Sequence, residues 1–455
     1  MNFTVRRRIF WSFIISFFVL SPFIILYTAG YRLAKNEFGV VKTGTIIIST
    51  DPRQASISIN GKDTSKTTPT LLRGLQPGRY DIGLTKVGYL PWSKRLDVTA
   101  DQATFASNIR LFKSAAPLLR LKGNSIAMWS KANGTQTLII ENDNSDPHIY
   151  HLSLLPRIPS SPLVPIATVN GSSVTPIDWS PDETKIILQV DQSWMIVNLA
   201  TLQSSSLKTT DVPEGTFTLR FSQNNSLYAA THKQLFLLEK GTNSYDPKPE
   251  RNPISALGKN AHITDFWIDA DRIYEAISLD ASKSVLRISK NSSLNTEMTT
   301  LPDSGDYHYL ASDSNTLILE HQGDLSLYNI TSETPSLLKT ISSANTAVIG
   351  DNGEILYSNG FELQRYAPLT NTSTLLLRSA QSIKKLAWLA DSRHVLFASD
   401  QGISVVDTQR PEPYTTWMIS PLLSLQNYAT TTDATALYFA GTLPDGTAGL
   451  FEQPL

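Results

Sequence analysis

The sequence predicts an all-β protein that follows one N-terminal apolar helix. Three observations carry this prediction. An uncharged apolar run of 19 residues, 9–27, comes directly after three consecutive arginines. Residues 43–112 alternate short apolar strands with turns rich in Gly and Pro. Residues 116–455 then repeat a strand-rich unit at a steady period. Runs of the helix-favouring residues Ala, Glu and Lys are few, which agrees with the β class.

Composition excludes several classes of function. The formal net charge of the 455 residues is −1, so no global field attracts the chain to nucleic acid or to anionic lipid. Cysteine is absent, which rules out disulfides, thiolate metal sites and a cysteine nucleophile. The length is sufficient for several domains.

The N-terminal segment has the features of a membrane anchor. At 1.5 Å per residue, residues 9–27 span roughly 30 Å, the thickness of a bilayer's hydrocarbon core. Arg6, Arg7 and Arg8 favour a cytoplasmic N-terminus, and Trp11 and Tyr27 lie near the two ends. We therefore expect a cytoplasmic tail at 1–8, a single transmembrane helix at 9–29 and a linker at 30–42, with the rest of the chain extracytoplasmic.

Two alternatives remain for this segment. A signal peptide would be cleaved near residues 28–30, whose Thr-Ala-Gly sequence is a fair cleavage site, although its apolar region is usually shorter than this one. The helix could also be the buried core helix of a soluble protein.

Residues 43–112 predict a small β-sandwich of six or seven strands. Residues 45–49, 55–60, 80–84, 94–98 and 105–111 read as strands, and Asn60-Gly61 is a strong hairpin signal. Gly61, Gly78 and Gly88 are expected at turns. Tyr80, Tyr89 and Trp92 are expected in the core and at its rim rather than as a ligand platform.

The order of these residues resembles the PEGA domain family. Its motifs are a Pro-x-x-Ala turn, an Asn-Gly hairpin, a Thr-Pro pair, a Leu-x-x-Gly-x-Tyr strand start and a Gly-Tyr pair, found here at 52–55, 60–61, 68–69, 75–80 and 88–89. Arg53 and Gln54 replace the name-giving Glu and Gly, at turn positions. The resemblance implies a β-sandwich with a binding or spacer role, without known catalytic residues. The family is found mostly on surface and envelope proteins of bacteria and archaea.

The long C-terminal region contains degenerate repeats. One unit reads IDWSPDETKIILQVDQSWMIVNLAT at 177–201, with an aromatic residue, an Asp turn and two apolar strands. Its first position recurs 38–50 residues apart, at Trp129, Trp179, Phe221, Trp267, Leu310, Val348, Trp388 and Thr430. Asp or Asn follows in the turn, where the side chain caps its own backbone: Asp182, Asn224, Asp271, Asp313, residues 351–353, Asp391 and Asp433.

This period is typical of one four-stranded blade of a β-propeller. The region resembles WD-repeat and TolB-like propellers, and residues 179–182 (Trp-Ser-Pro-Asp) match their turn well. We expect eight blades, with seven as the alternative, over residues 116–455. Residues 118–121 are expected to complete the last blade and so close the ring. Residues 155–165 and 244–253 are expected to be loops.

No constellation of catalytic residues is evident, and we expect no catalytic, cofactor or metal site. His148 and His151 form the only close histidine pair. Residues 141–146 are oxygen-rich but read better as a solvated loop than as a Ca²⁺ site. Trp129, Trp179, Trp267 and Trp388 fit core packing better than a sugar-binding surface. Asn-x-Ser/Thr sequons occur at Asn133, Asn170, Asn225, Asn291, Asn329 and Asn371, a number expected by chance in a chain rich in Ser and Thr.

The sequence thus favours a non-enzymatic binding or scaffolding protein of the bacterial cell envelope, anchored in the membrane. Its expected partner is an envelope protein or polysaccharide bound by the propeller's loop face. Two hypotheses compete with it. The first is a propeller hydrolase acting on glycans or peptides, with carboxylates or histidines converging at one mouth of the channel. The second is an extracytoplasmic sensor subunit that needs a membrane partner, since the tail is too short for a signalling domain.

Overall fold

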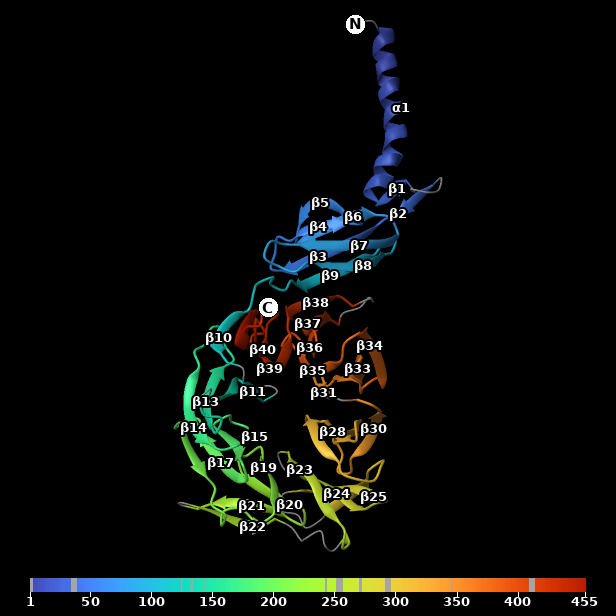
Figure 1. Ribbon diagram of the computed structural model, residues 1–455. Helices are drawn as coiled ribbons and strands as arrows, with labels where there is room; N and C mark the ends of the chain where they lie inside the picture. Colours follow the sequence, from blue (N-terminus) through green and yellow to red (C-terminus); the bar gives the residue numbers. More distant parts are fainter. Residues whose placement is uncertain are drawn as a thin grey trace. The chain divides into compact units, whose positions relative to one another are not determined.

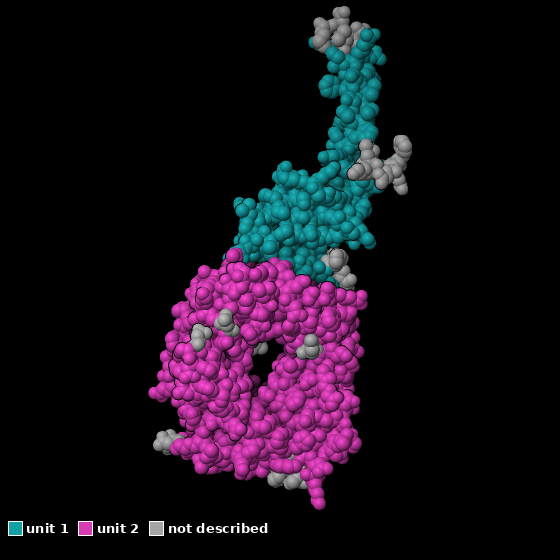
Figure 2. Space-filling model, in the orientation of Figure 1, with its two compact units in different colours: residues 1–115, 407–417 teal, residues 116–406, 418–455 magenta. Residues whose placement is uncertain are grey.

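The computed structural model describes residues 3–33, 39–123, 125–131, 134–143, 145–241, 244–250, 257–269, 272–290, 296–344, 346–408 and 414–455. Asn133, Asp271 and Asn291, named above, lie outside them, as do residue 144 of the oxygen-rich run 141–146 and residues 251–253 of an expected loop. The chain divides into two compact units, residues 1–115 with 407–417, and residues 116–406 with 418–455 (Figures 1 and 2). Each unit is described by itself. Residues 407–417, expected in the propeller, therefore group with the first unit.

The first unit begins with one long helix, α1 (Phe3–Thr28). The segment from Arg6 to Thr28 is long and apolar enough to cross a membrane. The helix begins before the predicted span and includes the three arginines. Beyond it, part of the expected linker is a hairpin: β1 (Tyr31–Leu33) pairs antiparallel with β2 (Val40–Lys42).

The same unit contains the expected sandwich of seven strands. A sheet of order β6-β3-β9 faces one of order β5-β4-β7-β8. Their bounds are β3 (Gly44–Asp51), β4 (Ser56–Ile59), β5 (Lys62–Thr67), β6 (Thr70–Leu75), β7 (Gly78–Thr85), β8 (Trp92–Val98) and β9 (Ala103–Arg110). Buried side chains alternate along β3 and β8, so Ile46, Ile48 and Trp92 lie in the core. Positive φ values of 48° at Asn60 and 77° at Gly61 confirm the predicted hairpin between β4 and β5.

The second unit is a propeller. From β10 (Leu118–Lys122) onward, the described residues form eight four-stranded sheets, one for each repeat found in the sequence. First strands of neighbouring sheets contact one another and so line the central axis. Figure 2 shows an opening through this unit.

The strands of the propeller follow the repeats in chain order. The first four sheets contain β11 (Ile126–Ser130), β12 (Gln136–Asn142), β13 (Ile149–Pro156), β14 (Val164–Asn170); β15 (Val174–Trp179), β16 (Lys185–Val190), β17 (Ser193–Asn198), β18 (Gln203–Ser206); β19 (Thr216–Phe221), β20 (Leu227–Thr231), β21 (Leu235–Lys240), β22 (Tyr245–Pro249); β23 (His262–Ile268), β24 (Arg272–Asp280), β25 (Lys283–Lys290), β26 (Thr296–Thr300).

The remaining sheets continue the same pattern. They contain β27 (His308–Ser312), β28 (Thr316–His321), β29 (Asp324–Asn329), β30 (Ser336–Ile341); β31 (Thr346–Ile349), β32 (Ile355–Ser358), β33 (Glu362–Ala367), β34 (Thr372–Arg378); β35 (Ile383–Trp388), β36 (His394–Ser399), β37 (Gly402–Asp407), β38 (Thr416–Pro421); β39 (Ser424–Thr430), β40 (Ala436–Thr442), β41 (Ala448–Pro454).

The predicted closure of the ring is confirmed. β10 pairs antiparallel with β41, with Leu118 opposite Glu452 and Lys122 opposite Gly449, and completes the sheet of β39, β40 and β41. One loop prediction is wrong in part, because β22 occupies residues 245–249 within the expected loop 244–253. Its two prolines are compatible with pairing since β22 is the outermost strand of its sheet and has one free edge.

Candidate binding surfaces

The repeat residues named from the sequence have structural roles. Asp182 Oδ1 accepts hydrogen bonds from the Thr184 amide at 3.0 Å and its hydroxyl at 2.8 Å. Asp313, Asp391 and Asp433 cap the equivalent turns. Trp179 and Trp267 are buried; Trp179 stacks on Trp129 with ring centroids 5.4 Å apart. Trp179 and Trp267 therefore pack in the interior, while Trp129 and Trp388 are half-buried.

The acidic loop also stabilises itself. Asp143 Oδ1 accepts bonds from Ser145 and from the Asp146 amide, and its Oδ2 lies 3.0 Å from His151 Nε2. The bonds from Ser145 and His151 hold the pKa of Asp143 well below its usual range. Within the described residues, no three His, Cys, Asp or Glu side chains are grouped as metal ligands.

Polar side chains line the propeller axis and connect neighbouring sheets, and three of them share one pattern of hydrogen bonds. Asp178 on β15 accepts a bond from the Phe221 amide on β19 at 2.7 Å. Asp265 on β23 accepts one from the Tyr309 amide on β27 at 2.9 Å. Asn427 on β39 donates to the Met128 carbonyl on β11 at 2.7 Å. Each also accepts a bond from the amide of the residue that follows it. We call these three residues the inner braces.

Two cations lie beside the braces. Arg220 on β19 donates to both oxygens of Asp265 at 3.0 and 3.2 Å, and its guanidinium lies 5.2 Å from the Tyr309 ring. Lys385 on β35 donates to Asn427 Oδ1. Burial and, to a smaller extent, the charge of Arg157 together lower the pKa of Lys385 to about 8. Burial raises the pKa of Asp178 to about 6, against its bonds from backbone amides.

We interpret the shifted pKa values of Asp178 and Lys385 as consequences of structural hydrogen bonds and burial rather than of a catalytic role. The carboxylates of Asp178 and Asp265 each accept backbone bonds on both oxygens, so neither is placed as a free acid or base. Perturbed pKa values also accompany structural ion pairs, and the repetition of the brace on three inner strands favours that explanation.

A second polar cluster lies on the face of the propeller where the first strands of the sheets begin, which we call the start face. His262 Nε2 lies 3.0 Å from Asp306 Oδ1. His321 Nδ1 lies 2.7 Å from the Asp306 carbonyl. The His232 ring meets that of His262 at 6.0 Å and stacks on Phe217 at 4.7 Å. This start-face cluster spans three consecutive sheets.

Sequence reasoning missed the start-face cluster because its members are far apart along the chain. His232 lies in the turn after β20, His262 begins β23, and His321 ends β28. The repeat period is the one signal in the sequence that could have placed these positions at the same end of their sheets. The side chains of His262 and Asp306 are 36% and 59% exposed, so a partner can reach them.

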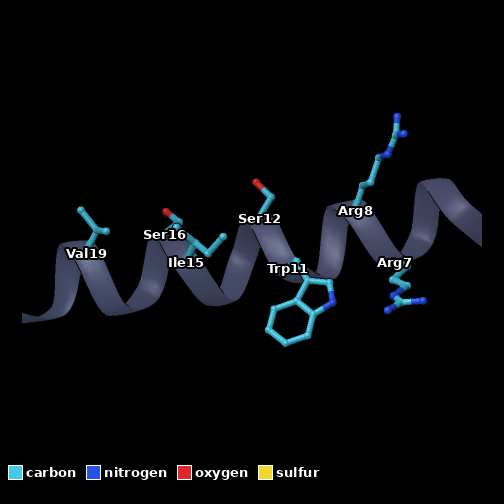
Figure 3. Close-up of a pocket in the computed structure, with 7 residues that line it drawn as sticks. All are labelled: Arg7, Arg8, Trp11, Ser12, Ile15, Ser16 and Val19. Carbon is cyan, nitrogen blue, oxygen red and sulfur yellow. The ribbon is translucent and has the colours of Figure 1, made fainter.

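A further concavity lies along α1 alone. Figure 3 shows its lining residues: Arg7, Arg8, Trp11, Ser12, Ile15, Ser16 and Val19. Because all belong to a single helix, the surface is open on its other side and is no enclosed pocket.

Comparison with known families decides the nature of the sandwich. The model of the PEGA domain matches residues 43–113. Residues 43–113 form a PEGA domain. This confirms the resemblance found in the sequence, and the seven strands β3–β9 lie within the matched range. No curated protein matches the chain.

Solved structures similar to the chain include propellers. The C-terminal WD40 domain of Sif2 shares 13% identity at a TM-score of 0.49, covering 76% of this chain and 98% of that one. Dihydro-heme d1 dehydrogenase NirN in complex with DHE shares 13% identity at a TM-score of 0.46, covering 75% and 76%. The propeller fold of residues 116–455 follows from its own sheet order and ring closure.

Proposed function

We propose that the protein is a membrane-anchored, extracytoplasmic binding or scaffolding protein of a bacterial cell envelope. In this proposal α1 is the uncleaved anchor, with residues 6–8 on the cytoplasmic side. The PEGA domain is the spacer, and the propeller presents its start face to an envelope protein or polysaccharide. The apolar helix and the two β modules that follow it support this arrangement.

The observation that carries the binding role is the contrast between the channel and the start face. In the channel, the carboxylates of Asp178 and Asp265 are engaged by backbone amides. On the start face, His262 and Asp306 are accessible and combine hydrogen-bonding groups with neighbouring aromatic rings. Exposed polar and aromatic groups on a rigid scaffold recognise a ligand without needing to transform it. We therefore propose no enzymatic activity.

The test is retention of envelope components by the full chain in detergent. The bait is immobilised and exposed to the source organism's envelope fraction, and bound proteins and glycans are both identified. His262→Ala is the start-face variant, and Thr370→Ala, an exposed change in the turn after β33, is the matched control. We expect a defined component to be retained by the wild type and the control and lost from His262→Ala.

Two results would overturn the proposal. One is equal retention by all three proteins, which would place binding elsewhere. The other is turnover of a glycan or peptide panel by the wild type that Asp178→Asn abolishes, which would favour the hydrolase hypothesis.

A further inference from the structure

The PEGA domain has an apolar row on one of its outer faces. In the β6-β3-β9 sheet, the register places Leu71, Ile47 and Phe105 side by side. Phe105 is 69% exposed and Leu71 is 40% exposed. Ile46 and Ile48 fill the core from the opposite side of β3, so Ile47 points outward.

The other outer face of the same domain is charged. Across β7 and β8, Arg79 pairs with Asp97 at 3.2 Å and Arg95 with Asp81 at 2.7 Å. Alternating charges on neighbouring strands are typical of a sheet face that stays in water. The charged face is suited to water, whereas the apolar face is suited to contact with another apolar surface. Exposing a large aromatic ring to water does not stabilise a monomer.

The outward positions of the apolar face include one carboxylate, that of Asp51 at the end of β3, where the register pairs it with Arg110. The other outward positions of the three strands are Thr45, Ile47, Ser49, Leu71, Arg73, Ala103, Phe105 and Ser107. Because the charges of Asp51 and Arg110 offset each other, the net charge of the face is that of Arg73, which lies opposite Thr45. An apolar centre with a cationic margin is complementary to an anionic lipid surface.

The face also starts beside the end of the helix. The Gly30 carbonyl, two residues beyond α1, accepts bonds from the Thr43 amide at 3.0 Å and the Thr43 hydroxyl at 2.7 Å. The strand β3 begins at the next residue, Gly44. Ile47 is three residues further along, roughly 10 Å at the rise of a β-strand. These bonds place the start of the apolar row beside the point where α1 would leave the hydrocarbon core.

We propose that the outer face of the β6-β3-β9 sheet is a lipid-contacting surface that holds the PEGA domain against the membrane. Leu71, Ile47 and Phe105 insert among the headgroups, and Arg73 pairs with lipid phosphates. This inference rests on the proposed anchor, because it takes α1 as the membrane span. It turns the PEGA domain from a free spacer into a second point of membrane attachment.

The absence of cysteine allows a direct test. Single cysteines are introduced at exposed positions of the full chain, labelled with an environment-sensitive fluorophore, and reconstituted in nanodiscs of phosphatidylcholine and phosphatidylglycerol. The lipids carry a spin-label quencher near the headgroup. Phe105→Cys probes the apolar face, and Ser56→Cys is the matched control on the other sheet's outer face. Phe18→Cys, in the middle of α1, reports on the anchor itself.

We expect a blue-shifted emission at position 105 that the lipid quencher suppresses, and an unshifted, unquenched emission at position 56. Replacing phosphatidylglycerol with phosphatidylcholine should weaken the quenching at 105 because Arg73 then loses its anionic partners. An emission at 105 like that at 56 overturns the proposal, and so does a blue shift that lipid cannot quench, which would indicate a protein cover. If the label at position 18 is itself outside lipid, the anchor fails; if only that at 105 is outside, the docking surface fails alone.

Discussion

The propeller and the PEGA domain are both built of short antiparallel strands, yet they place their charges differently. The propeller holds Asp265 buried and Asp178 and Arg220 half-buried beside its axis, where they join one sheet to the next. The PEGA domain keeps its pairs, Arg79 with Asp97 and Arg95 with Asp81, on an exposed face. In both regions apolar side chains hold neighbouring sheets together, and the propeller adds ion pairs and hydrogen bonds between its inner strands. We therefore expect an Arg–Asp pair to contribute measurably to the free energy of unfolding beside the propeller axis, but not on the exposed face of the PEGA domain.

The largest effect is expected from Asp265→Ala. It leaves the Arg220 guanidinium half-buried without its carboxylate and the Tyr309 amide without its acceptor. Breaking a buried pair costs about 3 kcal/mol. The free energy of unfolding should fall by this amount in denaturant titrations, with faster amide exchange in β23 and β27. An unchanged midpoint and unchanged exchange would show that the braces are dispensable.

Asp178 should make the propeller's stability depend on pH. Its folded-state pKa is raised from 3.8 to about 6, so its contribution to stability is complete below the unfolded value and is lost as pH rises through the folded one. The loss across this window is about 2–3 kcal/mol. Denaturant midpoints between pH values of about 4 and 7 should decline in the wild type and stay flatter in Asp178→Asn. Parallel curves for the two proteins would refute this assignment.

Gly449→Ala should weaken the ring closure. A Cβ at Gly449 would lie 2.3 Å from the Leu121 carbonyl oxygen, so β10 and β41 could not keep their spacing. Overpacking of this kind costs about 1–3 kcal/mol. Gly39→Ala is the control, since its Cβ meets nothing within 4 Å. Amide exchange in β10 should accelerate in Gly449→Ala alone; equal exchange in both variants would contradict the closure argument.

The smallest effect is expected from Arg95→Gln in the PEGA domain. Its partner Asp81 is exposed, and the bond from Arg95 holds the pKa of Asp81 below its usual value without a buried charge at stake. Exposed pairs contribute little to stability. The denaturant midpoint should not change measurably. A loss comparable to that of Asp265→Ala would remove the contrast between the two regions.

The sequence predicted most of the fold because its signals are local. Alternating apolar residues indicated the strands, Asn60-Gly61 indicated a hairpin, and a recurring Asp turn indicated the repeats. It missed β22, since two prolines within five residues normally argue against a strand. The hairpin of β1 and β2 was also missed, because each strand has only three residues.

The polar clusters could not be predicted in the same way. Whether Asp178 and Asp265 reach the next sheet depends on bulges in β15 and β23, which shift the register by one residue. The start-face cluster needs three sheets to be placed around one axis before His232, His262 and His321 approach Asp306. Both depend on tertiary geometry that no local pattern in this chain encodes.

The pairing of β10 with β41 also imposes an order in time. The ribosome makes residues 118–122 long before residues 448–454, an interval of roughly 15–65 s at 5–20 residues per second. Throughout that interval β10 has no partner strand, and the nascent sheets stand as an open row rather than a ring. The propeller is thus completed by its last-made segment, and cells that produce this protein must keep an unfinished β edge from associating with its neighbours until that segment arrives.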